Sequence, residues 1–431
     1  MKLARHLTSI LLLVLLTGVT VAADLPTARP ESVGMSTQRL GLLKSEMQAL
    51  VERNQLPGVL TMVAKDGKVV AFDVAGKRDL ESSAPLQKDS IFRIYSMTKP
   101  ITGVAMMMLF EEGKWQLNDP VSKHIPEWAN LKVAKVNPQN GSVTQVAPDH
   151  AMTMRELMSH SGGLSYGVFG STAVDKMYTD ANALNRDEPL QAMIDKLAKL
   201  PLAVQPGTDW RYGPVVDIQG YVVEKLSGQP LDVFLRTRIF EPLGMKDTGF
   251  WVDAAKKDRI TNIHTYGADK KIMTAATQGN PTSKPVFLSG GGGLLSTTED
   301  YFRFAQMFLN GGEANGKRLI KKSTVELMRT NVLEPGVNVD LYGPNSVQEG
   351  VGFGLDFAIV MDPAKAKLPE GKNSFYWGGA FGTWFWIDPT NDLLVVGMMQ
   401  NSEGSRPDRG SPQVRPLSRK LVYAALVDPK K

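Results

Sequence analysis

The chain has 431 residues, of which 42% are hydrophobic and 22% are charged, so it is long enough to bury one large core or two interlocked ones. Its formal net charge of +5 is not gathered into blocks of Lys and Arg, so it offers no electrostatic footprint for nucleic acid or a membrane surface. It contains no cysteine, and its five histidines lack the paired helical spacing of a zinc site. We therefore expect neither a metal nor a cofactor.

Residues 1–23 differ in composition from the rest of the chain. Lys2 and Arg5 precede an apolar run over residues 10–16, and residues 21–23 offer a site for cleavage. This is the pattern of a secretory signal peptide, because the apolar run is short for a membrane span. We expect a periplasmic or secreted protein with no stable membrane anchor after cleavage.

The next elements predict a helix and then an antiparallel pair of strands. Ser36 suits the N-cap of a helix over residues 37–53, where apolar residues share one face. Two β-branched runs follow, over residues 59–64 and 68–74, and Asp66-Gly67 between them is a strong hairpin signal. This part of the chain therefore begins an antiparallel sheet.

The first chemically suggestive pair is Ser96 and Lys99. If residues 96–112 form a helix, the two side chains share a face at its first turn. A serine nucleophile needs a neighbour that accepts its proton, and burial at a positive helix end pushes Lys99 toward the neutral form that a base requires. The alternative is that Ser96 only caps the helix and Lys99 is solvated.

Residues 118–204 lack strand patterning and predict short helices, including residues 153–158 and 190–200, with a surface loop over residues 137–149. Within this region, Gly163-Leu164-Ser165-Tyr166-Gly167 matches the Gly-x-Ser-x-Gly elbow of α/β-hydrolases. Ser165 is therefore a rival nucleophile. The context is wrong for that elbow, however, because no buried strand precedes the serine, so a glycine-rich loop is the alternative.

Tyr212 precedes Gly213-Pro214 and a helix over residues 216–226, so we expect its side chain to be aimed by a tight turn. A glycine-rich loop over residues 290–293 and a helix over residues 298–309 follow.

Strand patterning returns near the C-terminus. Residues 374–387 and 393–399 predict a hairpin, and a last helix over residues 412–426 would cover one sheet face. Trp377-Gly378-Gly379-Ala380 lies in the first of these strands, where two glycines would open room for a ligand beside the backbone.

Taken together, these motifs resemble the serine β-lactamase and penicillin-binding protein superfamily, in its class C-like branch, and most of all the family VIII carboxylesterases. The first motif of that superfamily, Ser-x-x-Lys, is matched by Ser96 and Lys99, and the tyrosine of its second motif by Tyr212. Its third motif, often Trp-Gly-Gly in the esterases, is matched by Trp377, Gly378 and Gly379.

The resemblance implies an α+β fold of the β-lactamase/transpeptidase-like type, in which an antiparallel sheet is flanked by helices. The α/β sheet domain would comprise residues 24–115 and 285–431, with a mostly helical domain over residues 116–284 inserted between them. The site would lie where the two domains meet.

The resemblance also implies roles for individual residues. Ser96 would attack the substrate carbonyl, while Lys99 and Tyr212 share the role of base; the sequence leaves open which of them carries the proton. Backbone N–H groups of Ser96 and Ala380 would form the oxyanion hole, and Trp377, Gly378 and Gly379 would bind substrate. No metal or cofactor is required.

Two departures from the family pattern bear on the substrate. Pro214 stands where the second motif usually has an asparagine, and Trp377 stands where β-lactamases have a lysine. Both changes weaken recognition of amides and carboxylates. They leave an apolar pocket, extended by Trp384 or Phe381, that favours neutral short-chain esters. The alternatives are a class C-like β-lactamase, a D-alanyl-D-alanine carboxypeptidase, or a cell-wall or β-lactam binding protein without turnover.

Overall fold

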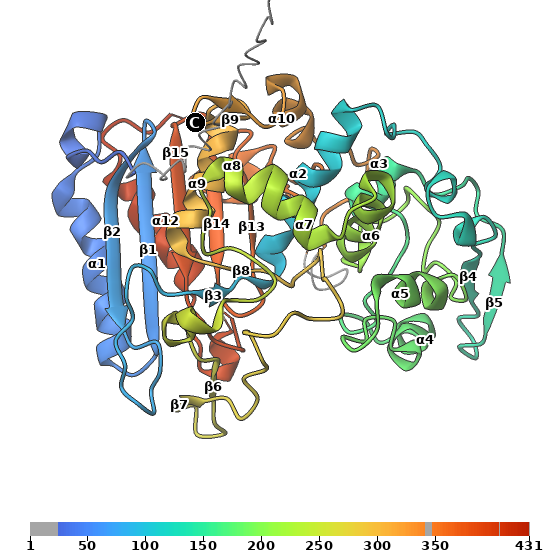
Figure 1. The fold of residues 1–431 in the computed structure, drawn as a ribbon, viewed down its shortest axis with the longest axis horizontal. Helices are drawn as coiled ribbons and strands as arrows, with labels where there is room; N and C mark the ends of the chain where they lie inside the picture. Colours follow the sequence, from blue (N-terminus) through green and yellow to red (C-terminus); the bar gives the residue numbers. More distant parts are fainter. Residues whose placement is uncertain (1–24, 341–346, 405, 431) are drawn as a thin grey trace, which may run out of the picture.

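The computed structural model describes residues 25–340, 347–404 and 406–430. The predicted signal peptide lies outside the described residues. None of the described helices has both the length and the apolar character needed to cross a bilayer. In Figure 1 a large sheet with its covering helices lies on the left and a group of helices lies on the right.

The main sheet has seven strands, all paired antiparallel, in the order β11-β12-β13-β14-β15-β1-β2. The N-terminal hairpin therefore lies beside the C-terminal strand β15, with Leu60 opposite Met398. This confirms the predicted antiparallel sheet built from both ends of the chain. The strands are β1 (Gly58–Lys65), β2 (Lys68–Gly76), β11 (Val351–Phe353), β12 (Ala358–Val360), β13 (Phe375–Gly378), β14 (Trp384–Asp388) and β15 (Leu393–Met398).

Two local predictions at the start of the chain are confirmed. The Ser36 side chain accepts a hydrogen bond from the Arg39 N–H and caps helix α1 (Thr37–Glu52). Asp66 and Gly67 have φ values of +52° and +70° at the turn between β1 and β2. A two-residue hairpin turn of type I′ requires this left-handed backbone at both central positions.

Helices cover both faces of the sheet. Because successive strand residues point to opposite faces, one set of side chains packs against α1 and α12 (Val414–Ala425), and the other against α2 (Thr98–Glu111) and α9 (Thr298–Leu309). The predicted helices at the end of the chain and after the glycine-rich loop are therefore confirmed. Trp384 is 2% exposed and packs on the α1–α12 face. The prediction that Trp384 extends a substrate pocket is wrong.

The prediction of a single strand over residues 374–387 is also wrong. β13 and β14 are separate strands, joined by a tight turn over residues 379–383. Gly382, with a φ of +99°, donates its N–H to the Gly379 carbonyl at 3.1 Å inside this turn. Aromatic residues, which favour strands, stand on both sides of the glycines, so the sequence pattern resembles that of one continuous strand.

The helical side of the molecule contains short helices, as predicted. α3 begins after a capping box at Thr153, and α6 ends at Gly228 with a φ of +69°. The helices are α3 (Met154–Met158), α4 (Ala173–Ala181), α5 (Leu190–Leu197), α6 (Val215–Ser227), α7 (Leu231–Leu235) and α8 (Glu241–Leu243).

The prediction that residues 118–204 form no strands is wrong. β4 (Val133–Val136) and β5 (Val143–Val146) make a two-stranded hairpin, so part of the expected loop over residues 137–149 is strand. β5 is mostly exposed and therefore lacks the alternation of apolar and polar residues by which a half-buried strand is recognised.

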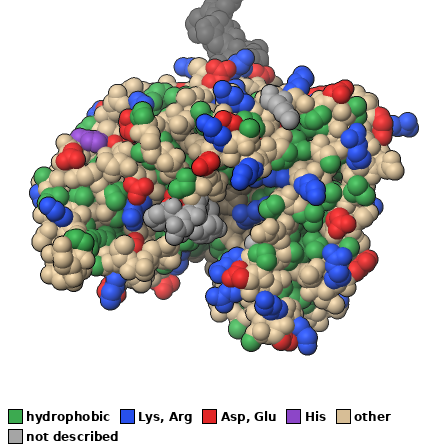
Figure 2. Space-filling view, turned by 180° about the vertical axis from the view of Figure 1, so that it is seen from behind, with side chains coloured by type: hydrophobic (Ala, Val, Ile, Leu, Met, Phe, Trp, Pro, Cys, Tyr) green, Lys and Arg blue, Asp and Glu red, His purple; other side chains and the backbone are tan. Residues whose placement is uncertain are grey.

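Short elements join the two sides of the molecule. Residues 249–264 form bridges to the sheet side, including Ile260 with Ile91 and His264 with Asn401. One hydrophobic cluster runs through both sides. From behind, Figure 2 shows a notch between them at the lower edge of the molecule, with cationic and anionic side chains interspersed over this face. The division at residues 116 and 285 stays a prediction. The remaining elements are β3 (Phe92–Arg93), β6 (His264–Tyr266), β7 (Ile272–Thr274), β8 (Leu295–Ser296), β9 (Glu313–Ala314), β10 (Lys317–Arg318), α10 (Lys322–Met328) and α11 (Pro363–Ala366).

Candidate active site

Ser96 lies at a sharp entry into helix α2. A 3₁₀ turn over Tyr95–Met97 precedes the helix, so α2 begins at Thr98 and not at Ser96 as predicted. Tyr95 has a φ of +44°, a backbone conformation that non-glycine residues rarely adopt, and its ring packs 4.1 Å from that of Phe381. Such strained positions cluster at functional sites, and this one leaves the Ser96 side chain half-buried.

Two segments far apart in the sequence bring Ser96, Lys99 and Tyr212 together. The Tyr212 hydroxyl donates a hydrogen bond to Ser96 Oγ at 2.8 Å, and the Lys99 amine donates to the same oxygen at 3.3 Å. The next residue, Gly213, donates its N–H to His160 Nδ1 at 3.3 Å, which fixes the turn that aims Tyr212. The three predicted side chains therefore lie within hydrogen-bonding reach of one hydroxyl.

Lys99 is buried, with 2% of its surface exposed. Its amine donates to the carbonyl of Gly291 at 2.7 Å and to the hydroxyl of Tyr166 at 3.2 Å. Burial of the amine lowers the pKa of Lys99, but interaction with Tyr166, Tyr212 and Asp217 raises it by more, so the pKa lies above its ordinary value. The direction of this shift is opposite to the expectation that burial and the helix end favour a neutral Lys99.

The Gly-x-Ser-x-Gly segment contributes to the site through a residue other than its serine. Ser165 is buried, donates to Asp175 Oδ1 at 2.7 Å and accepts from the Gly167 N–H at 2.9 Å. These two hydrogen bonds stabilise the loop that contains Ser165. Tyr166, the next residue, carries the hydroxyl that reaches Lys99. Tyr166 was not predicted from the sequence, although its position inside a familiar motif was an available signal.

The third motif closes the site from the sheet side. Trp377 is 9% exposed, and its ring lies 5.6 Å from that of Tyr212 and 5.5 Å from that of Phe353. A Cβ atom on Gly378 would lie 2.7 Å from the Arg415 guanidinium, and one on Gly379 would lie 2.4 Å from the carbonyl oxygen of Ile94. The room beside the two glycines is therefore filled by this chain, which corrects the prediction that it is open to a ligand.

Because Gly379 lies against Ile94, the β13–β14 turn is placed next to the segment that contains Ser96. Ala380 is exposed in this turn, and within the described part of the chain its N–H makes no hydrogen bond. Arg415, on α12, donates to the carbonyl of Thr383 at 2.9 Å and to that of Gly379. Arg415 was not predicted from the sequence, because nothing local links residue 415 to residues 379–383.

An aromatic wall surrounds Tyr212. The ring of Phe169 lies 5.6 Å away and that of His160 lies 5.1 Å away. Burial and the neighbouring Lys99 charge hold the pKa of His160 well below its ordinary value, so its imidazole is neutral. Val168 and Phe169 are exposed at 69% and 47%, which gives the site an apolar rim.

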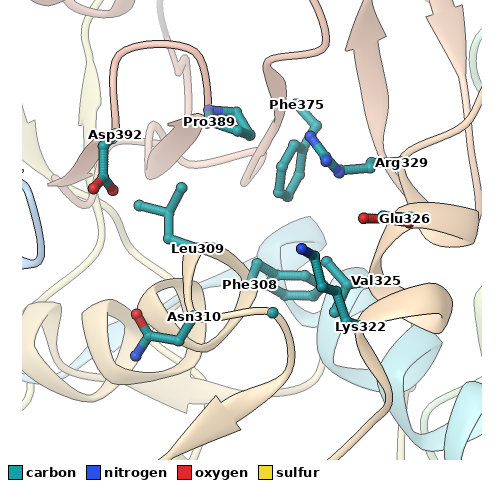
Figure 3. A pocket seen from close by; sticks show the side chains of 11 residues that line it. Phe308, Leu309, Asn310, Lys322, Val325, Glu326, Arg329, Phe375, Pro389 and Asp392 are labelled. Carbon is teal, nitrogen blue, oxygen red and sulfur yellow. The ribbon is translucent and has the colours of Figure 1, made fainter.

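The cavity in Figure 3 is separate from this site. It measures about 440 Å³ and is lined by the end of α9, by α10 and by the turn between β14 and β15, with Phe308 and Phe375 among its lining residues. Phe375 begins β13, whereas Gly379, just beyond the other end of the strand, lies against the carbonyl of Ile94, two residues before Ser96. None of the predicted site residues lines this cavity.

Comparison with known proteins agrees with the geometry. The chain is 33% identical over 362 residues to Protein Rv1367c of Mycobacterium tuberculosis, covering 83% of this chain and 89% of that protein. It is 28% identical over 368 residues to Esterase EstB of Burkholderia gladioli, covering 81% and 87%. The solved structure of Simvastatin Synthase (LovD) from Aspergillus terreus superposes with a TM-score of 0.76 at 22% identity, covering 90% of this chain and 99% of that one.

A family model described as Beta-lactamase matches residues 43–416, which span all the predicted catalytic residues and the Trp-Gly-Gly strand. That match, the esterase among the relatives and the shared fold indicate a hydrolase. The chain belongs to the β-lactamase family, with the β-lactamase/transpeptidase-like fold.

Proposed function

We propose that the protein is a serine hydrolase that cleaves short-chain carboxylic esters through an acyl-enzyme on Ser96. The observation that carries the proposal is the contact of one hydroxyl, Ser96 Oγ, with both Tyr212 at 2.8 Å and Lys99 at 3.3 Å. A serine is activated when it is hydrogen-bonded to a base and a second group orients that base and stabilises its negative charge.

In the proposed reaction, Ser96 Oγ attacks the ester carbonyl carbon and gives its proton to Tyr212. The bond from carbon to the alkoxy oxygen then breaks, and Tyr212 returns the proton to the leaving alcohol. Water then attacks the acyl carbonyl carbon and gives a proton to Tyr212. The bond from that carbon to Ser96 Oγ breaks, and Tyr212 returns the proton to Ser96 as the acid leaves. The Lys99 cation, 4.8 Å from the centre of the Tyr212 ring, favours the phenolate form that accepts these protons.

The oxyanion would be stabilised by the N–H groups of Ser96 and Ala380. Hydrogen-bond donors fixed before reaction act on charge that develops in the transition state. Ala380 is an exposed residue and its N–H makes no hydrogen bond to the described residues, which suits it to this task.

The choice of esters rests on two positions. Trp377 is packed among aromatic rings where a lysine would attract a carboxylate, and Pro214 has no side-chain hydrogen bond for a substrate amide. The apolar rim of Val168 and Phe169 suits an apolar acyl or alcohol group. We also propose, from residues 1–23, that the protein acts in the periplasm or outside the cell.

Steady-state hydrolysis of p-nitrophenyl acetate and butyrate by wild type, Ser96→Ala and Ser165→Ala tests the proposal, with a circular dichroism spectrum of each protein as the folding control. We expect Ser96→Ala to abolish turnover and Ser165→Ala to retain it. Loss of turnover only in Ser165→Ala would overturn the assignment of the nucleophile.

The second candidate is a β-lactamase or D-alanyl-D-alanine carboxypeptidase, which the family match favours. Hydrolysis of a chromogenic cephalosporin faster than of either ester would select it. A single burst of acylation without steady turnover would instead select a binding protein.

A further inference from the structure

Asp217 is a buried carboxylate close to the proposed catalytic residues. It lies in the first turn of α6, five residues after Tyr212, and is 1% exposed. Its Oδ1 accepts hydrogen bonds from the Ser289 hydroxyl at 2.5 Å and from the Gly291 N–H at 3.1 Å. Two converging donors suit a negative charge. No ion pair to Asp217 is found among the described residues.

Gly291 joins Asp217 to Lys99. Its N–H bonds to Asp217, while its carbonyl oxygen accepts from the Lys99 amine at 2.7 Å. A Cβ atom at this position would lie 2.7 Å from Asp217 Oδ2, so only glycine permits so close a contact. The neighbouring Gly290 carbonyl is fixed by the Thr102 hydroxyl of α2 at 2.9 Å. A single residue of an anchored loop therefore separates a buried anion from a buried amine.

We propose that Asp217 is a positioning residue that supplies the buried negative charge opposite Lys99 and so keeps Lys99 cationic beside Ser96 and Tyr212. This inference rests on the proposed function, in which a Lys99 cation favours the Tyr212 phenolate. A buried charge is costly unless an opposite charge balances it. The negative charge of Asp217 would balance the positive charge of Lys99, since both groups are hydrogen-bonded to Gly291.

The other titratable groups around Lys99 do not supply this charge at rest. Burial raises the pKa of the Tyr166 hydroxyl, so it is uncharged near neutral pH. His160 is neutral, because burial and the Lys99 charge lower its pKa. Burial raises the pKa of Asp356, in the loop between β11 and β12, to about 8. Tyr212 is the group whose proton moves in the reaction. Among these groups, Asp217 is therefore the one left to supply a negative charge opposite Lys99.

The test uses Asp217→Asn, which keeps an oxygen acceptor for Ser289 and Gly291 but removes the charge. Lys99 should then lose its proton more readily, so the alkaline limb of the pH profile of kcat/KM should move down by at least one pH unit. We expect little loss of kcat/KM at pH 6.5 and about a threefold or greater loss at pH 10.5. Ser289→Ala is the matched control, because it removes one hydrogen bond to Asp217 and leaves the charge.

The second readout is the rate at which a fluorophosphonate labels Ser96 from pH 6 to pH 10.5, where the Ser96 oxygen displaces fluoride from phosphorus. Labelling tests Asp217 even if no ester is hydrolysed, so failure of the proposed function is seen separately. The proposal is overturned if Asp217→Asn and Ser289→Ala reduce both rates equally at every pH without shifting the profile.

If Asp217→Asn does not fold, wild type alone remains decisive. Its labelling rate should not decline below pH 10, because a balanced Lys99 keeps its proton there. A decline centred at pH 8 to 9, while circular dichroism shows the fold intact, would contradict the proposal.

Discussion

The hydroxyl of Tyr166 lies 3.2 Å from the Lys99 amine, as close as Ser96 Oγ at 3.3 Å. Lys99 therefore divides its hydrogen bonds among the nucleophile, the Gly291 carbonyl and a tyrosine that belongs to none of the three family motifs quoted above. The rings of Tyr166 and Tyr212 also meet edge to face at 5.3 Å. Tyr166 thus helps to fix both partners of Ser96.

Tyr166→Phe should lower the activity while the ring packing persists. A hydrogen bond to a charged group contributes about 1.5 kcal/mol, so we expect about a tenfold fall in kcat/KM for p-nitrophenyl butyrate. KM should change little, because the hydroxyl faces Lys99 and the rest of the ring is retained.

Tyr178→Phe is the control for Tyr166→Phe. The Tyr178 hydroxyl is also buried and donates to the carbonyl of Pro201 at 3.1 Å, without a contact to Lys99. It should lower the melting temperature and leave kcat/KM near that of wild type. Equal activities for the two variants would show that the Tyr166–Lys99 bond does not matter for turnover.

A second prediction concerns Arg415, which holds the β13–β14 turn by the carbonyls of Gly379 and Thr383. Arg415→Met keeps much of the side-chain volume but removes these donors. The turn that carries the Ala380 N–H should then be less well fixed, so kcat should fall by roughly tenfold or more, with KM changed by less than threefold. Stopped-flow acylation with p-nitrophenyl acetate separates the two effects.

Lys420→Met is the matched control for Arg415→Met. Lys420 lies on the same helix, α12, and is exposed, so the substitution removes one positive charge without touching the turn. Its kcat should equal that of wild type. If Arg415→Met matches this control, the turn is held firmly enough without the guanidinium.

Local signals in the sequence predicted the parts of the fold that local forces determine. The cap at Ser36 and the hairpin turn at Asp66-Gly67 each depend on a few adjacent residues. The grouping of Ser96, Lys99 and Tyr212 was also predicted, because two of them share one short segment and the motif order supplied the third.

Features that depend on distant segments were not predictable in this way. Gly378 and Gly379 resemble openings for a ligand until Arg415 and the Ile94 carbonyl are seen to fill the space. Two groups that raise the pKa of Lys99 were not predicted for the same reason, because Tyr166 and Asp217 lie 67 and 118 residues away in sequence. Only the fold brings these groups together, so no local pattern could reveal them.

Phe169 should influence the choice of acyl chain. It is 47% exposed, and its ring packs 5.9 Å from Tyr166 and 5.6 Å from Tyr212 at the rim of the site. Phe169→Ser removes this apolar surface, so the ratio of kcat/KM for butyrate to that for acetate should fall about three- to tenfold, since burial of each methylene contributes about 0.8 kcal/mol.

Val286→Ser serves as the control for Phe169→Ser, because Val286 is 59% exposed and makes no ring contact with either tyrosine. Its butyrate-to-acetate ratio should match wild type. An unchanged ratio in Phe169→Ser would show that the acyl group does not reach this part of the rim.

The last prediction concerns the pH dependence of stability. Asp356 is 1% exposed, accepts from the Gln219 amide at 3.1 Å, and has its pKa raised to about 8 by burial. An unfolded aspartate titrates near pH 4, so the folded state holds an extra proton between about pH 4 and pH 8. Stability should therefore fall as the pH rises through this window, by up to about 1.4 kcal/mol per pH unit from this group, and the full cost should be present above pH 8.

Asp356→Asn removes this cost, because its amide does not ionise. Asparagine also tolerates the φ of +67° at this position and keeps an oxygen acceptor for Gln219. Urea unfolding followed by tryptophan fluorescence at pH 5, 7 and 9 should give a free energy of unfolding that declines less in Asp356→Asn than in wild type. Asp258→Asn, at an exposed position, should follow wild type. Parallel curves for wild type and Asp356→Asn would mean that Asp356 is already ionised, or never ionises, across this range.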